Sequence, residues 1–98
     1  MIVGEVVGTI VATRKEERLE GLKFQIVKIF NMDMKPTGQF LVAADAVGAG
    51  KGEMVLCAQG SSARLTERTE NKPIDAVIMG IVDTIEVGGE KIFEKYAG

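Results

Sequence analysis

The sequence contains no histidine, no tryptophan and only one cysteine, Cys57, among its 98 residues. Because histidine is the commonest general base and a frequent metal ligand, its absence excludes serine–histidine triads, zinc fingers and zinc hydrolase sites. A lone cysteine cannot form an intrachain disulfide, and its apolar setting predicts a small buried side chain in a reducing compartment. We therefore expect no catalytic residues, no metal and no cofactor, and we predict that the protein is not an enzyme.

Long apolar runs and an excess of basic residues are also missing. No segment approaches the roughly 20 apolar residues of a membrane span, and the N-terminal stretch has no basic leader and reaches Glu5 early. Lysine and arginine number 12 against 14 aspartate and glutamate, so the formal net charge is -2. These features predict a cytoplasmic protein that contacts neither a membrane nor nucleic acid.

The sequence does contain enough apolar material for one folded domain, which we predict spans residues 1–98. Hydrophobic residues make up 46% of the chain and charged residues 27%, which argues against disorder. A chain of this length has no room for a second domain core. The apolar share is high for a small β protein with a large surface, and this favours association between copies.

The central stretch combines two apolar strands with two bends made of small residues. We predict a strand from Phe40 to Val47, a glycine loop over 48–52, and a second strand from Glu53 to Ala58. The Gly-Ser-Ser triplet that follows predicts one helical turn over 61–65, capped by one of its serines. A compact β-barrel needs such corners, and so does a contact between subunits.

Two predicted strands are apolar on both alternating phases. The first spans Ile2 to Thr13, with its even positions predicted to face a barrel interior, and the second spans Asp75 to Val87. An antiparallel strand with one solvated face alternates more cleanly than either of these. The second face is therefore covered either by another part of the chain or by another subunit.

The segment from Leu22 to Phe30 is predicted as a strand, with Phe24 and Ile26 facing inward and Lys23 and Gln25 facing outward. The connections around it are polar. The charged segment Arg14 to Gly21 is predicted as a solvated loop or as a polar contact to a neighbouring subunit, residues 31–39 as a turn-rich loop, and residues 66–73 as a flexible polar connection.

Gly88-Gly89 predicts a two-residue hairpin turn into a short terminal strand from Lys91 to Tyr96. No helical periodicity runs long enough for a substantial helix. The predicted fold is therefore all-β: a small OB-like five-stranded β-barrel with one short helix after the fourth strand and an extra C-terminal strand.

Three weaker patterns suggest chemistry without supporting it. The glycine loop lacks the Gly-Lys-Ser/Thr order and the long following helix of a nucleotide-binding loop. No motif supports a serine–lysine pair between Lys51 and the serines at 61 and 62. The aspartates in or beside strands, Asp45, Asp75 and Asp83, are expected to be hydrogen-bonded or to face outward.

An OB-type outline also leaves an alternative function, a binding module for single-stranded nucleic acid or another ligand. Binding of single strands requires stacking aromatic side chains along a basic groove. This chain has a net charge of -2 and no tryptophan. Most of its phenylalanines fall on apolar strand phases, so they are better placed in the core.

Three segments together resemble the EutN/CcmL family of vertex proteins from bacterial microcompartments and carboxysomes. They are VGEVVGTIVATRKEERLEGLKF near the start, VAADAVGAGKGEMVLCAQGSSAR in the centre and PIDAVIMGIVDTIEV near the end, in the family's order and spacing. The resemblance implies an OB-like barrel that assembles as a homopentamer. It implies a structural role, in which the pentamer caps the corners of a polyhedral shell tiled by hexameric shell proteins.

The resemblance also implies that the glycine loop and the segment Gly60 to Arg64 lie towards the ring axis or the subunit contacts. Arg64 then adds to an electropositive ring of helix starts, or forms a salt bridge with a neighbour's Glu53. The plainer alternative is that these residues only turn the chain. The candidate pore or contact residues are Gly48, Gly50, Lys51, Gly52, Glu53, Gly60, Ser61, Ser62 and Arg64.

Overall fold

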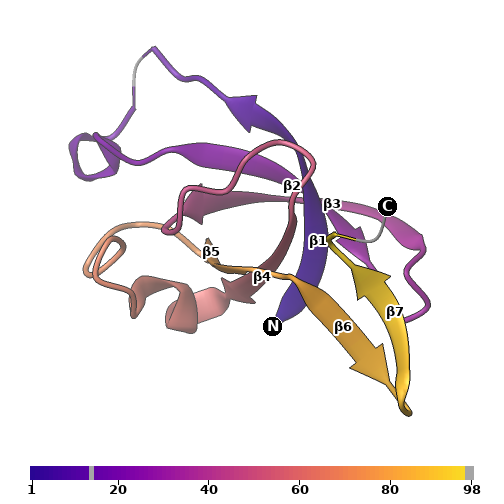
Figure 1. Cartoon of the computed structure of the whole chain (residues 1–98). Helices are drawn as coiled ribbons and strands as arrows, with labels where there is room; N and C mark the ends of the chain where they lie inside the picture. The colour runs from indigo at the N-terminus through magenta and orange to yellow at the C-terminus, as the bar shows by residue number, and fades with distance from the viewer. Residues whose placement is uncertain (14, 97–98) are drawn as a thin grey trace.

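The computed structural model describes residues 1–13 and 15–96, and its strands form a closed barrel and a separate two-stranded hairpin (Figure 1). Arg14, the first residue of the predicted charged connection, lies outside the described residues. The barrel strands are β1 (Ile2–Ile10), β2 (Phe24–Phe30), β3 (Pro36–Asp45), β4 (Met54–Gln59) and β5 (Ala76–Ile81), and the hairpin strands are β6 (Thr84–Val87) and β7 (Glu90–Glu94).

The barrel closes in the order β1-β2-β3-β5-β4, with β4 returning to β1. All neighbouring strands are antiparallel except β3 and β5, which are parallel. The only helical segments in the described part of the chain are two short 3₁₀ turns, η1 (Glu17–Leu19) and η2 (Gly60–Arg64). The predicted OB-like five-stranded barrel is confirmed, and the short helix after the fourth strand is η2.

Several predicted boundaries are wrong. The strand predicted from Asp75 to Val87 is two strands, because the amide of Val82 makes the last barrel contact, to the Met54 carbonyl at 2.8 Å. The chain then leaves the barrel and forms β6, so the C-terminal extension is a hairpin and not one added strand. Gly88 and Gly89 both have positive φ angles, 59° and 81°, which confirms the predicted turn.

The loop predicted over 31–39 is also too long, because β3 begins at Pro36. Proline has no amide proton to donate and is tolerated as the first residue of a strand. At the other end of the sheet, β1 stops at Ile10 and not at Thr13.

A β-bulge interrupts the simple alternation of β1, whereas β2 alternates regularly but in the phase opposite to the predicted one. The pairing register shifts between Val6 and Gly8, so even positions face inward up to Val6, and Thr9 then pairs with Gln25. Gln25 is only 3% exposed, so the prediction that Gln25 faces outward while Phe24 and Ile26 face inward is wrong. The inner phase of β2 is Gln25 and Val27.

Most of the buried apolar side chains of residues 1–13 and 15–96 form two hydrophobic clusters, one inside the barrel and one outside it. The inner cluster fills the barrel with small and β-branched side chains: Val6, Val27, Ala43, Ala49, Val55, Cys57, Ala76 and Ile78. The outer cluster comprises Ala44, Ala58, Ala63, Ile74 and Val77, with Leu19, Leu22, Phe24 and Ala46 packed against it. We call the outer side of the barrel at Ala44, Ala58 and Val77 the covered face, since η2 and the connection to β5 lie over it.

Gly4 allows β1 and β2 to approach closely. A Cβ atom at this position would lie 2.5 Å from both the Lys28 carbonyl oxygen and a Val27 methyl group. Gly8 differs, because a Cβ atom there would meet only the Ile26 Cδ1 atom at 3.6 Å, an ordinary contact. The close approach at Gly4 is therefore the one that the barrel requires.

Candidate subunit interface

The glycine loop between β3 and β4 is organised by the buried carboxylate of Asp45. Its Oδ1 atom accepts hydrogen bonds from the amides of Val47 and Gly48 at 3.0 and 2.9 Å, and its Oδ2 atom accepts one from the amide of Ala49 at 2.9 Å. The side-chain amide of Gln25 donates to the same oxygen at 3.2 Å and to the Ala49 carbonyl at 2.9 Å. This explains why a glutamine points into the barrel, and it confirms that Asp45 is hydrogen-bonded.

The far half of the glycine loop is attached to β1. The amide of Gly52 donates to the Val6 carbonyl at 2.7 Å, and the amide of Val6 donates to the Glu53 carbonyl at 3.0 Å. Gly48 and Gly52 have φ angles of 75° and 90°, a region that favours glycine. The loop thus presents Gly50 and Lys51 to the surface from a fixed frame.

Glu53 joins the glycine loop to the C-terminal end of the chain. Its Oε1 atom accepts the Gly50 amide at 2.7 Å, and its Oε2 atom accepts the Lys95 ammonium group at 2.8 Å. The hydrogen bond from Lys95 is the main reason that the pKa of Glu53 is lowered, and the same bond raises the pKa of Lys95. Glu53 therefore already has a cationic partner within its own chain.

The segment Gly60 to Arg64, the GSSAR turn, is a 3₁₀ turn with Ala63 buried beneath it. Its N-cap residue is Gln59 and makes no side-chain capping bond, so the prediction that Ser61 or Ser62 caps a helix is wrong. The Ser62 hydroxyl instead donates to the Gln59 carbonyl at 2.8 Å. Arg64 lies at the end of the turn and donates from Nη1 to the Ile74 carbonyl at 3.2 Å.

The two predicted contact segments do not meet within one chain. The glycine loop precedes β4 and the GSSAR turn follows it, so the six residues of this strand separate them. At about 3.3 Å per residue, the separation is roughly 20 Å. They are therefore two surfaces at opposite ends of β4, and not one site.

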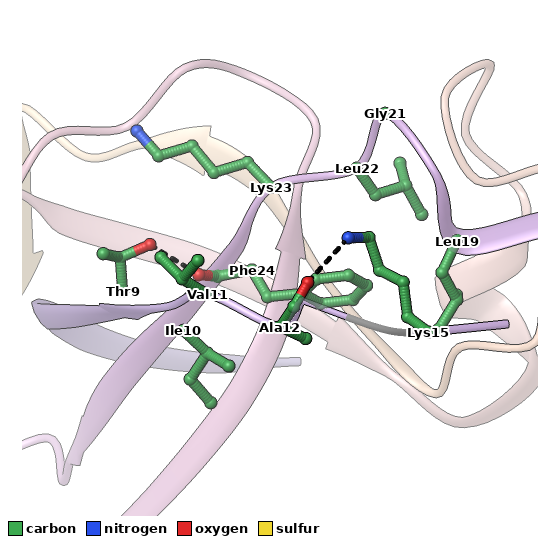
Figure 2. Close-up of a pocket in the computed structure, with 10 residues that line it drawn as sticks. All are labelled: Thr9, Ile10, Val11, Ala12, Lys15, Leu19, Gly21, Leu22, Lys23 and Phe24. Carbon is green, nitrogen blue, oxygen red and sulfur yellow. Dashed lines mark hydrogen bonds between the residues drawn. The ribbon is translucent and has the colours of Figure 1, made fainter.

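The structure adds an apolar surface that sequence reasoning did not locate. A cleft of about 690 Å³ lies between the end of β1, the start of β2 and the connection that joins them (Figure 2). Val11 at its rim is 89% exposed, and Ile10 is 40% exposed. The Thr9 hydroxyl donates to the Phe24 carbonyl, and the Lys15 ammonium group donates to the Ala12 carbonyl. The cleft is lined by Thr9, Ile10, Val11, Ala12, Lys15, Leu19, Gly21, Leu22, Lys23 and Phe24.

The outer side of β2 and β3, beyond the cleft, also carries apolar side chains. Gly8 pairs with Ile26, and Ile26 pairs with Val42, so these positions point to the same side of the sheet. Val42 is 48% exposed and Phe40, further along β3, is 60% exposed. We call this surface, formed by Ile10, Ile26, Phe40 and Val42, the exposed face.

The acidic side chains and the single cysteine are the remaining groups that bear on chemistry in the described residues. Within residues 1–13 and 15–96, no group of three or more acidic or cysteine side chains is placed to hold a metal ion. Burial raises the pKa of the Cys57 thiol to about 11, with a smaller contribution from the negative charge of Asp45. The same part of the chain has no helix long and apolar enough to cross a membrane.

The fold and the exposed face define an OB-like barrel with an uncovered apolar surface. Residues 1–83 match the family described as "Ethanolamine utilisation protein EutN/carboxysome". The chain is also 41% identical over 95 residues to the carboxysome shell vertex protein CcmL of Gloeobacter violaceus, covering 97% of this chain and 95% of that protein. The chain belongs to the EutN/CcmL family.

Two solved structures and a second sequence relative agree with this assignment. The structure of Gloeobacter violaceus CcmL has a TM-score of 0.96 at 40% identity and covers 99% of this chain and 100% of that chain. The GrpN pentameric microcompartment shell protein from Rhodospirillum rubrum has a TM-score of 0.78 at 44% identity, covering 89% and 98% of the two chains. The bacterial microcompartment shell vertex protein EutN of Salmonella typhimurium is 41% identical over 95 residues, covering 97% of this chain and 96% of that protein.

Proposed function

We propose that this protein is a structural shell protein whose homopentamers cap the vertices of a polyhedral bacterial microcompartment. The observation that carries the proposal is near-complete similarity, in sequence and in fold, to named shell vertex proteins, one of them described as pentameric. These relatives support a structural role, without catalysis, in a microcompartment shell. They do not support the alternative of a nucleic-acid-binding module.

The exposed face supplies a physical reason for the chain to associate. Apolar side chains from adjacent strands lie on the same side of the sheet there, and exposed apolar groups of this kind are typical of a site of protein contact. A head-to-tail contact between two different surfaces closes into a ring when its rotation is repeated around an axis. Five subunits placed where six would lie flat introduce the curvature that a closed shell needs.

The glycine loop and the GSSAR turn extend this proposal to particular residues. Both are exposed and held in fixed conformations by internal hydrogen bonds, and they flank β4 at its two ends. We place them at the ring axis or at subunit contacts, and we place hexameric shell proteins around the rim of the pentamer.

The first test is the mass of the assembled protein in solution, measured by native mass spectrometry. The expected mass is about five times the 10.5 kDa of the chain. A protein that stays monomeric at high concentration would contradict the proposal. Co-expression with hexameric shell proteins tests the second part, because closed polyhedral shells should form only when this chain is present.

A substitution at Gly50 tests the glycine loop. This residue does not have a positive φ angle, and a Cβ atom there would meet only a Glu53 carboxylate oxygen at 3.4 Å, so the single chain tolerates a larger side chain. Gly50→Trp should therefore weaken the pentamer while the chain stays folded. Lys35→Trp, at an exposed position in the turn between β2 and β3, is the matched control.

A further inference from the structure

A polar pocket of about 400 Å³, distinct from the apolar cleft, lies between η1, the end of η2 and the connection to β5. Three of its five lining residues are cationic and none is acidic, in a chain whose formal net charge is -2. We call it the cationic pocket. Its lining residues are Arg18, Arg64, Asn71, Lys72 and Pro73.

The cationic side chains are positioned by bonds that use only part of their donor capacity. Lys72 donates to the Arg18 carbonyl and Arg64 to the Ile74 carbonyl, each at 3.2 Å. Arg18 donates from Nε to Glu16 at 2.8 Å, whereas Arg64 and Lys72 have no ion pair with the described residues. A lysine has three donors and an arginine five, so several remain available to a ligand.

The wall of the cationic pocket is anchored to the covered face. Thr69 is fully buried, and its hydroxyl donates to the Ala63 carbonyl at 2.7 Å. The Lys72 amide donates to the Thr69 carbonyl at 3.1 Å, and Ile74 is 8% exposed within the outer cluster. Residues 66–73 were expected to form a flexible connection, but these contacts hold the pocket in place. A ligand would therefore meet cations that are already arranged.

The three cations come from separate segments and repel one another; Glu16, which bonds Arg18 and also interacts electrostatically with Lys72, offsets part of this cost, and an anion bound between the cations offsets more of it. Arginine presents its donors in a planar fork suited to phosphate oxygens, and lysine contributes a compact point charge. We propose that the cationic pocket binds a small phosphate-bearing anion. All five lining residues belong to one chain, and Arg64 is also part of the GSSAR turn that the proposed pentamer places at the ring axis or at a subunit contact, so the binding test also has to report the pentamer.

Titration of the assembled protein with inorganic phosphate at constant ionic strength, followed by amide NMR shifts, tests the inference. We expect saturable shifts concentrated at Arg18, Asn71 and Lys72, and weaker binding of acetate, which carries a single charge. The variant R64Q/K72Q should bind phosphate at least about tenfold more weakly, because it removes two charged donors. Lys72→Gln alone, which leaves the Arg64 bond to Ile74 intact, should show a smaller loss in the same direction.

The control variant K35Q/K91Q removes the same charge at exposed positions outside the pocket and should bind phosphate within about twofold of the parent chain. Shifts that do not saturate, or that spread over the whole surface, would overturn the inference. Equal losses in R64Q/K72Q and K35Q/K91Q would also overturn it, because net charge alone would then explain the binding. Native mass spectrometry of the same samples reports the pentamer independently.

Discussion

Both outer faces of the barrel carry apolar side chains, but the described chain covers only one of them. On the covered face, apolar side chains such as Val77 are buried by η2 and the connection to β5. On the exposed face, Phe40 and Val42 have no such cover in the described chain. An apolar pattern on both phases of a strand thus has two causes in one molecule: a second core within the chain, and a surface that a neighbouring subunit is proposed to bury.

The strongest test of this difference is a charge placed on the exposed face. Val42→Asp should convert the pentamer to monomers, because an unpaired carboxylate at a desolvated contact is strongly unfavourable. Native mass spectrometry measures the change. Val87→Asp in the β6–β7 hairpin is the matched control, since Val87 is 49% exposed and Val42 is 48% exposed. If only Val87→Asp dissociated the pentamer, the subunit contact would lie at the hairpin and not at the exposed face.

The covered face should respond in folding and not in assembly. Ile74→Ala removes a buried side chain from the outer cluster and should lower the free energy of unfolding by about 2–5 kcal/mol. Phe40→Ala on the exposed face should cost less than about 1 kcal/mol in the monomer. Both are measured by chemical denaturation in the Val42→Asp background, which separates folding from assembly.

Labelling of the Cys57 thiol provides a second probe of those unfolding measurements. Because burial raises its pKa to about 11, the thiol should react only when the barrel opens. Equal labelling rates in the Ile74→Ala and Phe40→Ala variants would contradict the distinction between the two faces.

Paired glycine substitutions in β1 should have an intermediate effect. Gly4→Ala forces β1 and β2 apart at Lys28, and overpacking of this kind costs about 1–3 kcal/mol. Gly8→Ala, after the bulge, should change the stability of the monomer by only a few tenths of a kcal/mol, either way. Denaturation of both variants in the Val42→Asp background measures this contrast, and a larger loss for Gly8→Ala would contradict the close approach at Gly4.

The smallest effect is expected at the Glu53–Lys95 pair, which belongs to neither face and remains partly exposed. The pKa of Glu53 is lowered on folding, so its contribution to stability is present above its ordinary pKa and is lost as the pH falls through the folded value. The pKa of Lys95 is raised, so its contribution is lost at alkaline pH. Glu53→Gln should therefore lower the melting temperature slightly near neutral pH, and the difference should vanish in acid.

The sequence predicted the order of the elements and missed the details that depend on pairing between distant strands. Val and Ile runs and the Gly88-Gly89 turn were sufficient to place the strands, because these signals are local. The inward side chain of Gln25 depends on two partners outside β2: a carboxylate 20 positions away, at Asp45, and the carbonyl of Ala49. Alternation within β2 alone contains neither, so the phase of this strand was predicted the wrong way round.

The candidate contact residues also divide into those that local sequence signals reveal and those that depend on strand pairing. The glycine loop was found as a fixed bend because glycines mark positive φ angles directly. The exposed face was not, because Ile26 and Val42 become neighbours only through strand pairing. The sequence does show an excess of apolar residues in strands such as β1. This excess indicates that a second apolar surface is covered, but it does not show where that surface lies.

The β6–β7 hairpin extends away from the barrel, and the chain measures 45 × 23 × 23 Å with a radius of gyration of 13.9 Å (Figure 1). A compact domain of 100 residues has a radius of gyration of about 13 Å. An elongated particle experiences more friction than a sphere of the same mass. A monomer of this protein will therefore elute early from a gel-filtration column and sediment slowly, so the two hydrodynamic methods will err in opposite directions when a spherical shape is assumed.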